Sequence, residues 1–237
     1  MNYFVTGTDT GVGKTLISCA LLYAFSASGK SVAGMKPVAA GCDEDGLNED
    51  VKNLRAATNI LASLGQINPY SFLHPIAPHI AARNAGVQIN LQRILESFHE
   101  LAAQAEVVIV EGAGGFLVPL NDTQDIADLA VALGLPVILV VGMRLGCLNH
   151  ALLTVRAIND CGLECAGWVA NVIDADMAAL DENIQALQQR IKAPLLAVVP
   201  HQTQPDARAI AAQFELDLLH GFVSAEKPII DSQADTK

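Results

Sequence analysis

Residues 7–15 read Gly-Thr-Asp-Thr-Gly-Val-Gly-Lys-Thr, and this stretch decides the fold of the chain. It follows the apolar run 3–5 and precedes a segment, 16–24, with apolar residues at helical spacing. The local order is therefore strand, glycine-rich turn, helix. Backbone N–H groups of such a turn converge at the helix N-terminus, where the helix dipole favours an anion. Gly11 and Gly13 let a phosphate approach the backbone closely, so we predict a phosphate-binding loop.

The end of this loop carries the residues that nucleotide chemistry needs. Lys14 is placed to reach the terminal phosphates, and the hydroxyl of Thr15 is a ligand for Mg²⁺. The usual pattern begins with glycine six residues before the lysine, but that position is Thr8 here and the glycine is Gly7. A plain glycine-rich turn is the alternative. The flanking strand and helix favour the nucleotide interpretation.

Composition limits the classes of protein and partner. The 237 residues suit one α/β domain, and the 51% of hydrophobic residues supply a large core. The net charge of −11 argues against nucleic acid or an anionic membrane as the main partner. No apolar run is long enough for a membrane span, and the first strand begins where a signal peptide would lie. The five cysteines lack metal-ligand spacing, so we expect reduced thiols and a cytoplasmic location.

Strand and helix patterns alternate along the chain. Continuous apolar runs such as 107–110 and 136–141 are typical of strands buried on both faces of a parallel sheet. We predict an α/β fold with one domain over residues 1–223, a parallel β-sheet flanked by helices on both faces, and a polar, mobile tail at 224–237. The expected strands lie near 2–6, 31–35, 107–110, 136–141, 165–170 and 194–199, and the expected helices near 14–28, 50–63, 90–104, 124–133, 147–161, 177–191 and 206–212.

Polar residues at the strand ends form one constellation. Lys36, Glu111 and Asn171 each lie at or just beyond the end of a predicted strand, as the phosphate loop does. Ligands of parallel sheets bind at the carboxyl ends of strands, so these side chains should share one edge. A second lysine indicates more negative charge than a nucleotide carries, which makes Lys36 a candidate for a second anion. The alternative for Lys36 is a solvated lysine, and the acidic run 43–50 is most simply a solvated loop.

Several motifs in fixed order resemble the dethiobiotin synthetase family. The resemblance extends from Tyr3 to about Pro200, and its motifs occupy residues 4–10, 13–15, 36–38, 68–70, 78–80, 110–115, 119–120, 145–151 and 167–171. It implies a single P-loop NTPase domain that forms homodimers. It also implies an ATP-dependent cyclo-ligase of biotin biosynthesis that uses Mg²⁺. The substrates would be ATP, CO2 and diaminopelargonic acid. One amine becomes a carbamate, the carbamate is phosphorylated by ATP, and the second amine closes the ring of dethiobiotin.

The resemblance also implies a role for individual residues. Lys36 would hold the carbamate and its phosphorylated product, and Lys14 would span the phosphates. Mg²⁺ would be held by Thr15, Asp50 and Glu111. The ATP site would comprise Gly11, Val12, Gly13, Lys14, Thr15, Leu16, Asp50, Glu111, Gly112, Ala113, Gly114, Asn171, Pro200, His201 and Gln202. The substrate site would comprise Thr10, Lys36 and Ala40, together with Leu145, Gly146, Cys147, Leu148 and Asn149 contributed by the partner subunit at the interface.

Three positions depart from the family pattern. Gly11 stands where some members carry a carboxylate, Ala40 where a hydroxyl residue is common, and Val172 where some members are acidic. These departures leave open a paralogue with another diamine or amine substrate. Two rival interpretations come from other classes of protein. A partition or septum-positioning ATPase would carry a second lysine where Asp9 stands. A ligase acting on cobyrinic acid would be expected to carry an amidotransferase domain, for which we see no room.

Overall fold

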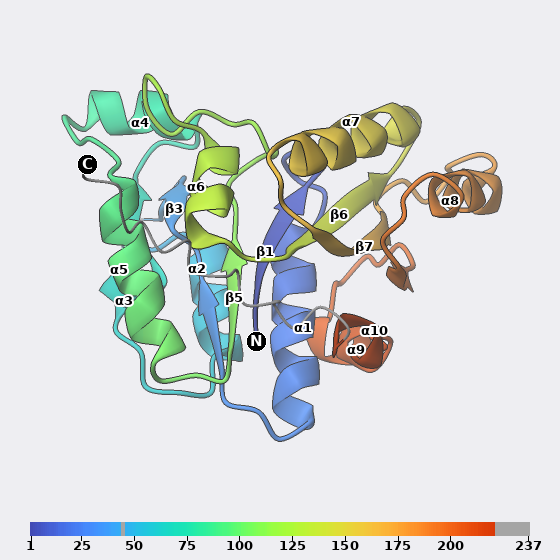
Figure 1. Cartoon of the computed structure of the whole chain (residues 1–237), viewed down its shortest axis with the longest axis horizontal. Helices are drawn as coiled ribbons and strands as arrows, with labels where there is room; N and C mark the ends of the chain where they lie inside the picture. The colour runs from blue at the N-terminus through green and yellow to red at the C-terminus, as the bar shows by residue number, and fades with distance from the viewer. Residues whose placement is uncertain (44–45, 221–237) are drawn as a thin grey trace, which may run out of the picture.

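The fold is a six-stranded parallel sheet with helices on both faces (Figure 1). The computed structural model describes residues 1–43 and 46–220. The strand order is β2-β5-β1-β6-β7-β8, so β1 lies inside the sheet between β5 and β6. The strands are β1 (Asn2–Gly7), β2 (Val32–Met35), β5 (Val107–Glu111), β6 (Val137–Met143), β7 (Cys165–Val172) and β8 (Leu195–Val199). A separate parallel pair is formed by β3 (Val38–Ala40) and β4 (Tyr70–Phe72).

Alternation along β1 shows how the sheet is covered. Tyr3 and Val5 belong to a core shared with helices of one face, whereas Phe4 belongs to a core on the opposite face. The first face is covered by α1 (Lys14–Ala27), α2 (Glu49–Ala57), α9 (Ala207–Ala211) and α10 (Asp217–His220). The opposite face is covered by α5 (Leu91–Ala102), α6 (Ile126–Leu133), α7 (Cys147–Asp160) and α8 (Leu180–Gln188). The predicted three-layer α/β fold is therefore confirmed.

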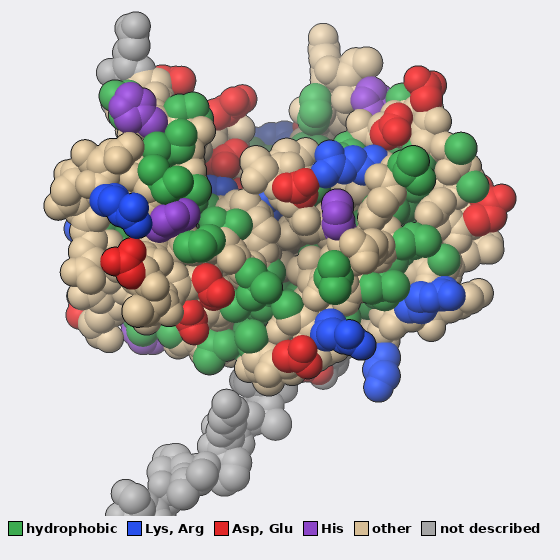
Figure 2. All heavy atoms as spheres, turned by 90° about the horizontal axis from the view of Figure 1, so that it is seen from above, with side chains coloured by type: hydrophobic (Ala, Val, Ile, Leu, Met, Phe, Trp, Pro, Cys, Tyr) green, Lys and Arg blue, Asp and Glu red, His purple; other side chains and the backbone are tan. Residues whose placement is uncertain are grey.

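Strand register brings the polar residues together. In the β2–β5 pair Met35 lies opposite Val110, so the next position in each chain places Lys36 beside Glu111. Both side chains have the strand parity of Val32 and Ile109, which face α1. Figure 2 looks onto this carboxyl edge of the sheet, and shows charged side chains of both signs in a hollow between two raised parts of the surface.

One predicted helix is wrong over its second half. The apolar spacing predicted a helix over 50–63, but α2 ends at Ala57. Thr58 and Asn59 turn the chain toward β2, because Thr58 Oγ1 accepts the Gly34 N–H at 2.9 Å and Asn59 Oδ1 accepts the Val32 N–H at 2.7 Å. Leu61, which completed the helical spacing, is 95% exposed.

Some elements were not predicted or are shorter than predicted. The β3–β4 pair, α3 (Leu64–Ile67) and α4 (Pro78–Asn84) lie in a stretch where prolines hid the pattern. Helix α8 is shorter than the predicted 177–191. The proposed tail at 224–237 and the last residues of the predicted domain lie outside the described residues. Among the described helices none is both long enough and apolar enough to cross a membrane.

Candidate functional site

The loop between β1 and α1 has the backbone geometry of an anion site. Gly11 and Gly13 have φ values of 74° and 91°, a left-handed conformation that favours glycine. A Cβ on Gly13 would lie 2.2 Å from Nδ2 of Asn171, which itself donates to the Val12 carbonyl at 2.8 Å. No side chain caps the N-terminus of α1, so no capping side chain competes with a ligand for the first N–H groups of this helix.

Lys14 is held inside this loop. Its Nζ donates to the carbonyl of Asp9 at 2.9 Å, and the side chain is buried. Burial, and then repulsion from Lys36, lower the pKa of Lys14 to about 8. Bound phosphate oxygens would reverse this effect because they favour the charged ammonium.

Three oxygen-bearing side chains meet beside the loop. Thr15 Oγ1 lies 2.6 Å from Asp50 Oδ1 and 2.8 Å from Glu111 Oε1. A hydroxyl has one proton, so it cannot donate fully to both carboxylates. Oε2 of the fully buried Glu111 has no hydrogen-bond partner among the described residues. A hydroxyl and two carboxylates that converge in this way fit the oxygen preference of Mg²⁺.

Lys36 forms ion pairs with both of these carboxylates. Its Nζ lies 2.5 Å from Glu111 Oε1 and 2.9 Å from Asp50 Oδ2, and it donates to the Gly112 carbonyl at 3.3 Å. Burial alone would lower the pKa of Lys36, but attraction and hydrogen bonds from Glu111 and Asp50 outweigh it and raise that pKa. Burial alone would likewise raise the pKa of Asp50, but Lys36 and Thr15 hold it below its usual value. The alternative of a solvated lysine is wrong, because Lys36 is 4% exposed.

A cavity of about 440 Å³ opens beside Lys36. Six of the predicted site residues line it: Thr10, Lys36, Ala40, Asp50, Ala113 and Gly114. Because Asp50 is among them, the acidic run is not merely a solvated loop. The rest of the wall was not predicted and consists of Val38, Asn48, Val118 and the loop 75–78. Prolines at 75 and 78 showed that this loop exists, but nothing in the pattern indicated the cavity it faces.

The remaining predicted residues lie outside this cavity. Leu145, Gly146 and Asn149 are exposed around the N-terminus of α7, whereas Cys147 is buried and Leu148 is half-buried. Pro200 and His201 are exposed just after β8, and Gln202 accepts the Asp206 N–H at 3.0 Å. Leu16 instead lines a second cavity of about 460 Å³ with Thr15, Cys19 and residues 205–208. The isolated chain therefore assembles the phosphate and Lys36 regions but not the segment 145–149.

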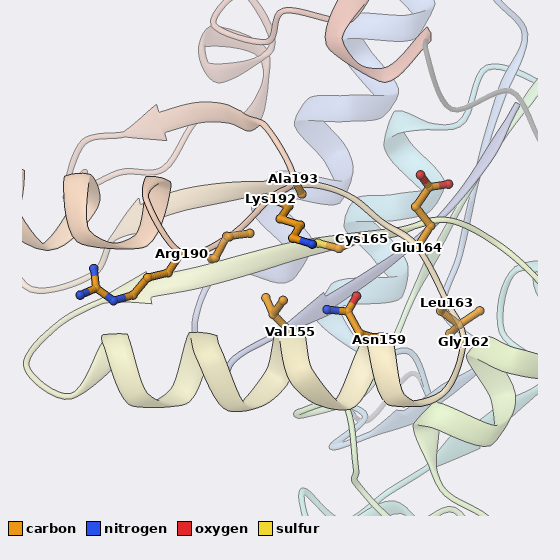
Figure 3. Close-up of a pocket in the computed structure, with 10 residues that line it drawn as sticks. Val155, Asn159, Gly162, Leu163, Glu164, Cys165, Arg190, Lys192 and Ala193 are labelled. Atoms are coloured by element: carbon orange, nitrogen blue, oxygen red, sulfur yellow. The ribbon is translucent and has the colours of Figure 1, made fainter.

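Another cavity, of about 610 Å³, lies away from these residues (Figure 3). It is lined by the end of α7, the start of β7 and the chain after α8. Its wall carries Arg190 and Lys192, but their charged ends point away from one another in Figure 3. It also lies at the amino end of β7, whereas parallel sheets bind ligands at the carboxyl ends.

A protein family and several known proteins are similar to this chain in sequence. The AAA-domain family matches residues 1–209. The ATP-dependent dethiobiotin synthetase BioD of Nitrosospira multiformis is 57% identical over 90% of this chain and 94% of its own length. The corresponding protein of Aromatoleum aromaticum is 56% identical over 90% of this chain and 96% of its own length. The chain belongs to the dethiobiotin synthetase family.

Solved structures resemble the chain in fold. A ParA family ATPase from Chlorobium tepidum superposes with a TM-score of 0.54 at 15% identity, covering 92% of this chain and 96% of that chain. Such identity shows the fold alone. The rival interpretation as a partition-type ATPase therefore rests on shared fold, whereas the two dethiobiotin synthetases above share more than half of the aligned residues with this chain.

The buried charges make a prediction about stability. Glu111→Leu should destabilise the protein by about 3 kcal/mol, because it leaves the Lys36 ammonium buried with only the partly exposed Asp50 as counter-charge. The double variant Lys36→Met/Glu111→Leu should regain most of this loss. Urea unfolding of both single variants and the double variant measures the coupling. Additive losses would show that charge compensation is not what holds the two side chains.

Proposed function

We propose that this chain catalyses the ATP-dependent carboxylation and ring closure of diaminopelargonic acid with CO2, which gives dethiobiotin, ADP and phosphate. One observation carries this proposal: a second, buried lysine stands between the phosphate loop and a cavity. Lys14 is held in the loop, whereas Lys36 pairs with Glu111 and Asp50 and also lines the cavity, where a second anion could meet its charge. The names of relatives more than 55% identical to the chain support the same reaction.

The phosphate region would act by holding charge in place. The loop N–H groups and Lys14 would bind the phosphates of ATP, with no reorganisation needed at the moment of transfer. Thr15, Asp50 and Glu111 would hold Mg²⁺, for which their converging oxygens are suited. When bound, this ion supplies positive charge to the phosphate oxygens during transfer.

Lys36 would serve the reacting carbamate. One amine of the diamine adds to CO2 and forms a carbamate, whose oxygen attacks the γ-phosphorus while the bond to ADP breaks. The second amine then attacks the carbamic carbon, the C–O bond to phosphate breaks, and the urea ring closes. Lys36 lies at the cavity wall, where its charge would oppose the negative charge of carbamate and phosphate. Val38, Ala40 and Pro78 give this cavity apolar walls for the methylene chain of the substrate.

Other residues would complete the site. Asn171 donates from Nδ2 to the Val12 carbonyl, so its Oδ1 would be left to accept a hydrogen bond from the amino group of adenine. The segment Pro200–Gln202 would lie beside the base. We assign segment 145–149 to the site of a partner subunit, because Leu145 is 95% exposed and α7 begins without a side-chain cap, which suits a carboxylate. The enzyme would thus be a homodimer. All five cysteines are free, which suits the reducing cytoplasm.

The activity itself is tested with the purified protein. With ATP, MgCl2, bicarbonate and diaminopelargonic acid, it should form dethiobiotin and release phosphate. Lys14→Ala should abolish turnover, since a preorganised charge on the transferred phosphoryl group contributes about a hundredfold or more. Phosphate release that does not depend on the diamine would contradict the proposal. Release that depends on a different diamine or amine would indicate the paralogue that Gly11, Ala40 and Val172 leave open.

Lys36→Gln separates the synthetase from a plain ATPase. The variant keeps similar bulk but loses the charge, so ATP should bind within a few fold while dethiobiotin formation falls by about a hundredfold or more. Nucleotide titration and single-turnover product formation measure the two effects. If both fall together, Lys36 is a nucleotide ligand. If neither falls, it has no part in the reaction.

The same variant should bind metal more tightly in the absence of nucleotide. The Lys36 ammonium occupies the carboxylates of Asp50 and Glu111, so it competes with any divalent cation there. We expect Lys36→Gln to raise the affinity for Mn²⁺ about tenfold, equal to about 1.4 kcal/mol. The electron paramagnetic resonance signal of unbound Mn²⁺ measures this affinity. Lys30→Gln removes the same charge from the surface pair with Glu106 and should change nothing. An equal rise in Mn²⁺ affinity in both variants would show that the change in net charge alone causes it, and not the removal of the ammonium from Asp50 and Glu111.

A further inference from the structure

Asp9 contacts two parts of the phosphate loop and one arginine outside it. Its Oδ1 accepts the Thr10 N–H at 2.7 Å, and its backbone carbonyl accepts Lys14 Nζ at 2.9 Å. Its Oδ2 lies 2.6 Å from Nη2 of Arg144, more than a hundred residues later in the chain. The carbonyl that receives Lys14 therefore belongs to a residue whose side chain is fixed from outside the loop.

Arg144 comes from the strand that already supports this loop. It is the first residue after β6, whose end contacts the loop at two further points. The Thr8 N–H donates to the Val140 carbonyl at 3.0 Å, and the Gly142 N–H donates to Thr8 Oγ1 at 3.3 Å. A Cβ on Gly142 would lie 2.7 Å from a methyl group of Val12, so strand and loop are already in close contact there. Arg144 extends this support to Asp9.

We propose that the Arg144–Asp9 ion pair positions Lys14 for the nucleotide. The pair fixes the peptide of Asp9, and the carbonyl of that peptide orients the Lys14 ammonium. Both partners are more than 40% exposed, so the pair contributes little to global stability. Its effect is on orientation. The inference rests on the proposed function only in taking the loop to bind ATP.

Charge and position predict opposite effects for one variant. Asp9→Asn removes a negative charge from beside the phosphate site, so electrostatics alone would tighten nucleotide binding. Loss of positioning would weaken it instead. The side-chain amide of asparagine still has an oxygen that accepts the Thr10 N–H, and the backbone carbonyl is unchanged, so the local turn is preserved. Asp9→Asn is therefore the decisive variant.

The experiment is calorimetric titration of the full chain with the non-hydrolysable analogue AMP-PNP and Mg²⁺. Asp9→Asn and Arg144→Gln should each weaken binding about tenfold, the size of one charge-assisted hydrogen bond. The double variant should be no weaker than the weaker single variant, and Arg144→Lys should recover most of the affinity. Arg83→Gln breaks another exposed arginine–aspartate pair, a longer one with Asp122 at 3.4 Å, and should leave binding unchanged.

Three results would overturn the role of the ion pair. These are an Asp9→Asn variant that binds AMP-PNP as tightly as the unaltered chain or more tightly, losses that add in the double variant, and a lower midpoint of thermal unfolding that alone accounts for the weaker binding. Failure of the unaltered chain to bind AMP-PNP would instead overturn the nucleotide function itself. The two failures are thus distinguishable.

Discussion

The ammonium of Lys36 between the carboxylates of Glu111 and Asp50 is the interaction on which the site depends. Placing Glu111, which is fully buried, in the protein interior costs several kcal/mol unless an opposite charge accompanies it. The two strands that carry Lys36 and Glu111 are hydrogen-bonded neighbours, so the compensation is built into the sheet. Asp50 adds α2 to the same group of charges, and Thr15 adds the start of α1.

This arrangement explains why the site is rigid where phosphate would bind and open where substrate would bind. The phosphate loop is held by β6 through Thr8, by Asn171 of β7 through Val12, and by its own lysine through Asp9. The cavity beside Lys36 is instead walled by the short strand β3, the start of α2 and the loop 75–78. Binding energy from the loop can therefore be used without reorganisation, which is the condition for electrostatic catalysis.

The sequence indicated which of these residues lie together, because the strand, turn and helix patterns and the strand ends can be recognised in it. Lys14 and Thr15 follow from the strand, turn and helix around them, and Lys36, Glu111 and Asn171 from the rule that parallel strands share one carboxyl edge. Long-range contacts carried no such signal. Arg144 pairs with Asp9, and Asn48 lies in the cavity wall, only because of the tertiary fold. At Leu61 the apolar spacing predicted a helix that does not form. The helix ends earlier because Thr58 and Asn59 accept hydrogen bonds from β2.

The small β3–β4 sheet has a consequence for how this protein can change. It is not hydrogen-bonded to the six-stranded sheet, yet it carries Val38 and Ala40 in the cavity wall. Substitutions in this pair and in the adjoining loop 75–78 can alter the shape of the cavity without moving the strands that hold Lys36, Glu111 and the phosphate loop. In the proposed function, the residues that would choose the substrate are thus separate from those that would bind ATP. A lineage that acquired a new amine substrate could do so by drift in the smaller module, while purifying selection held the larger one constant.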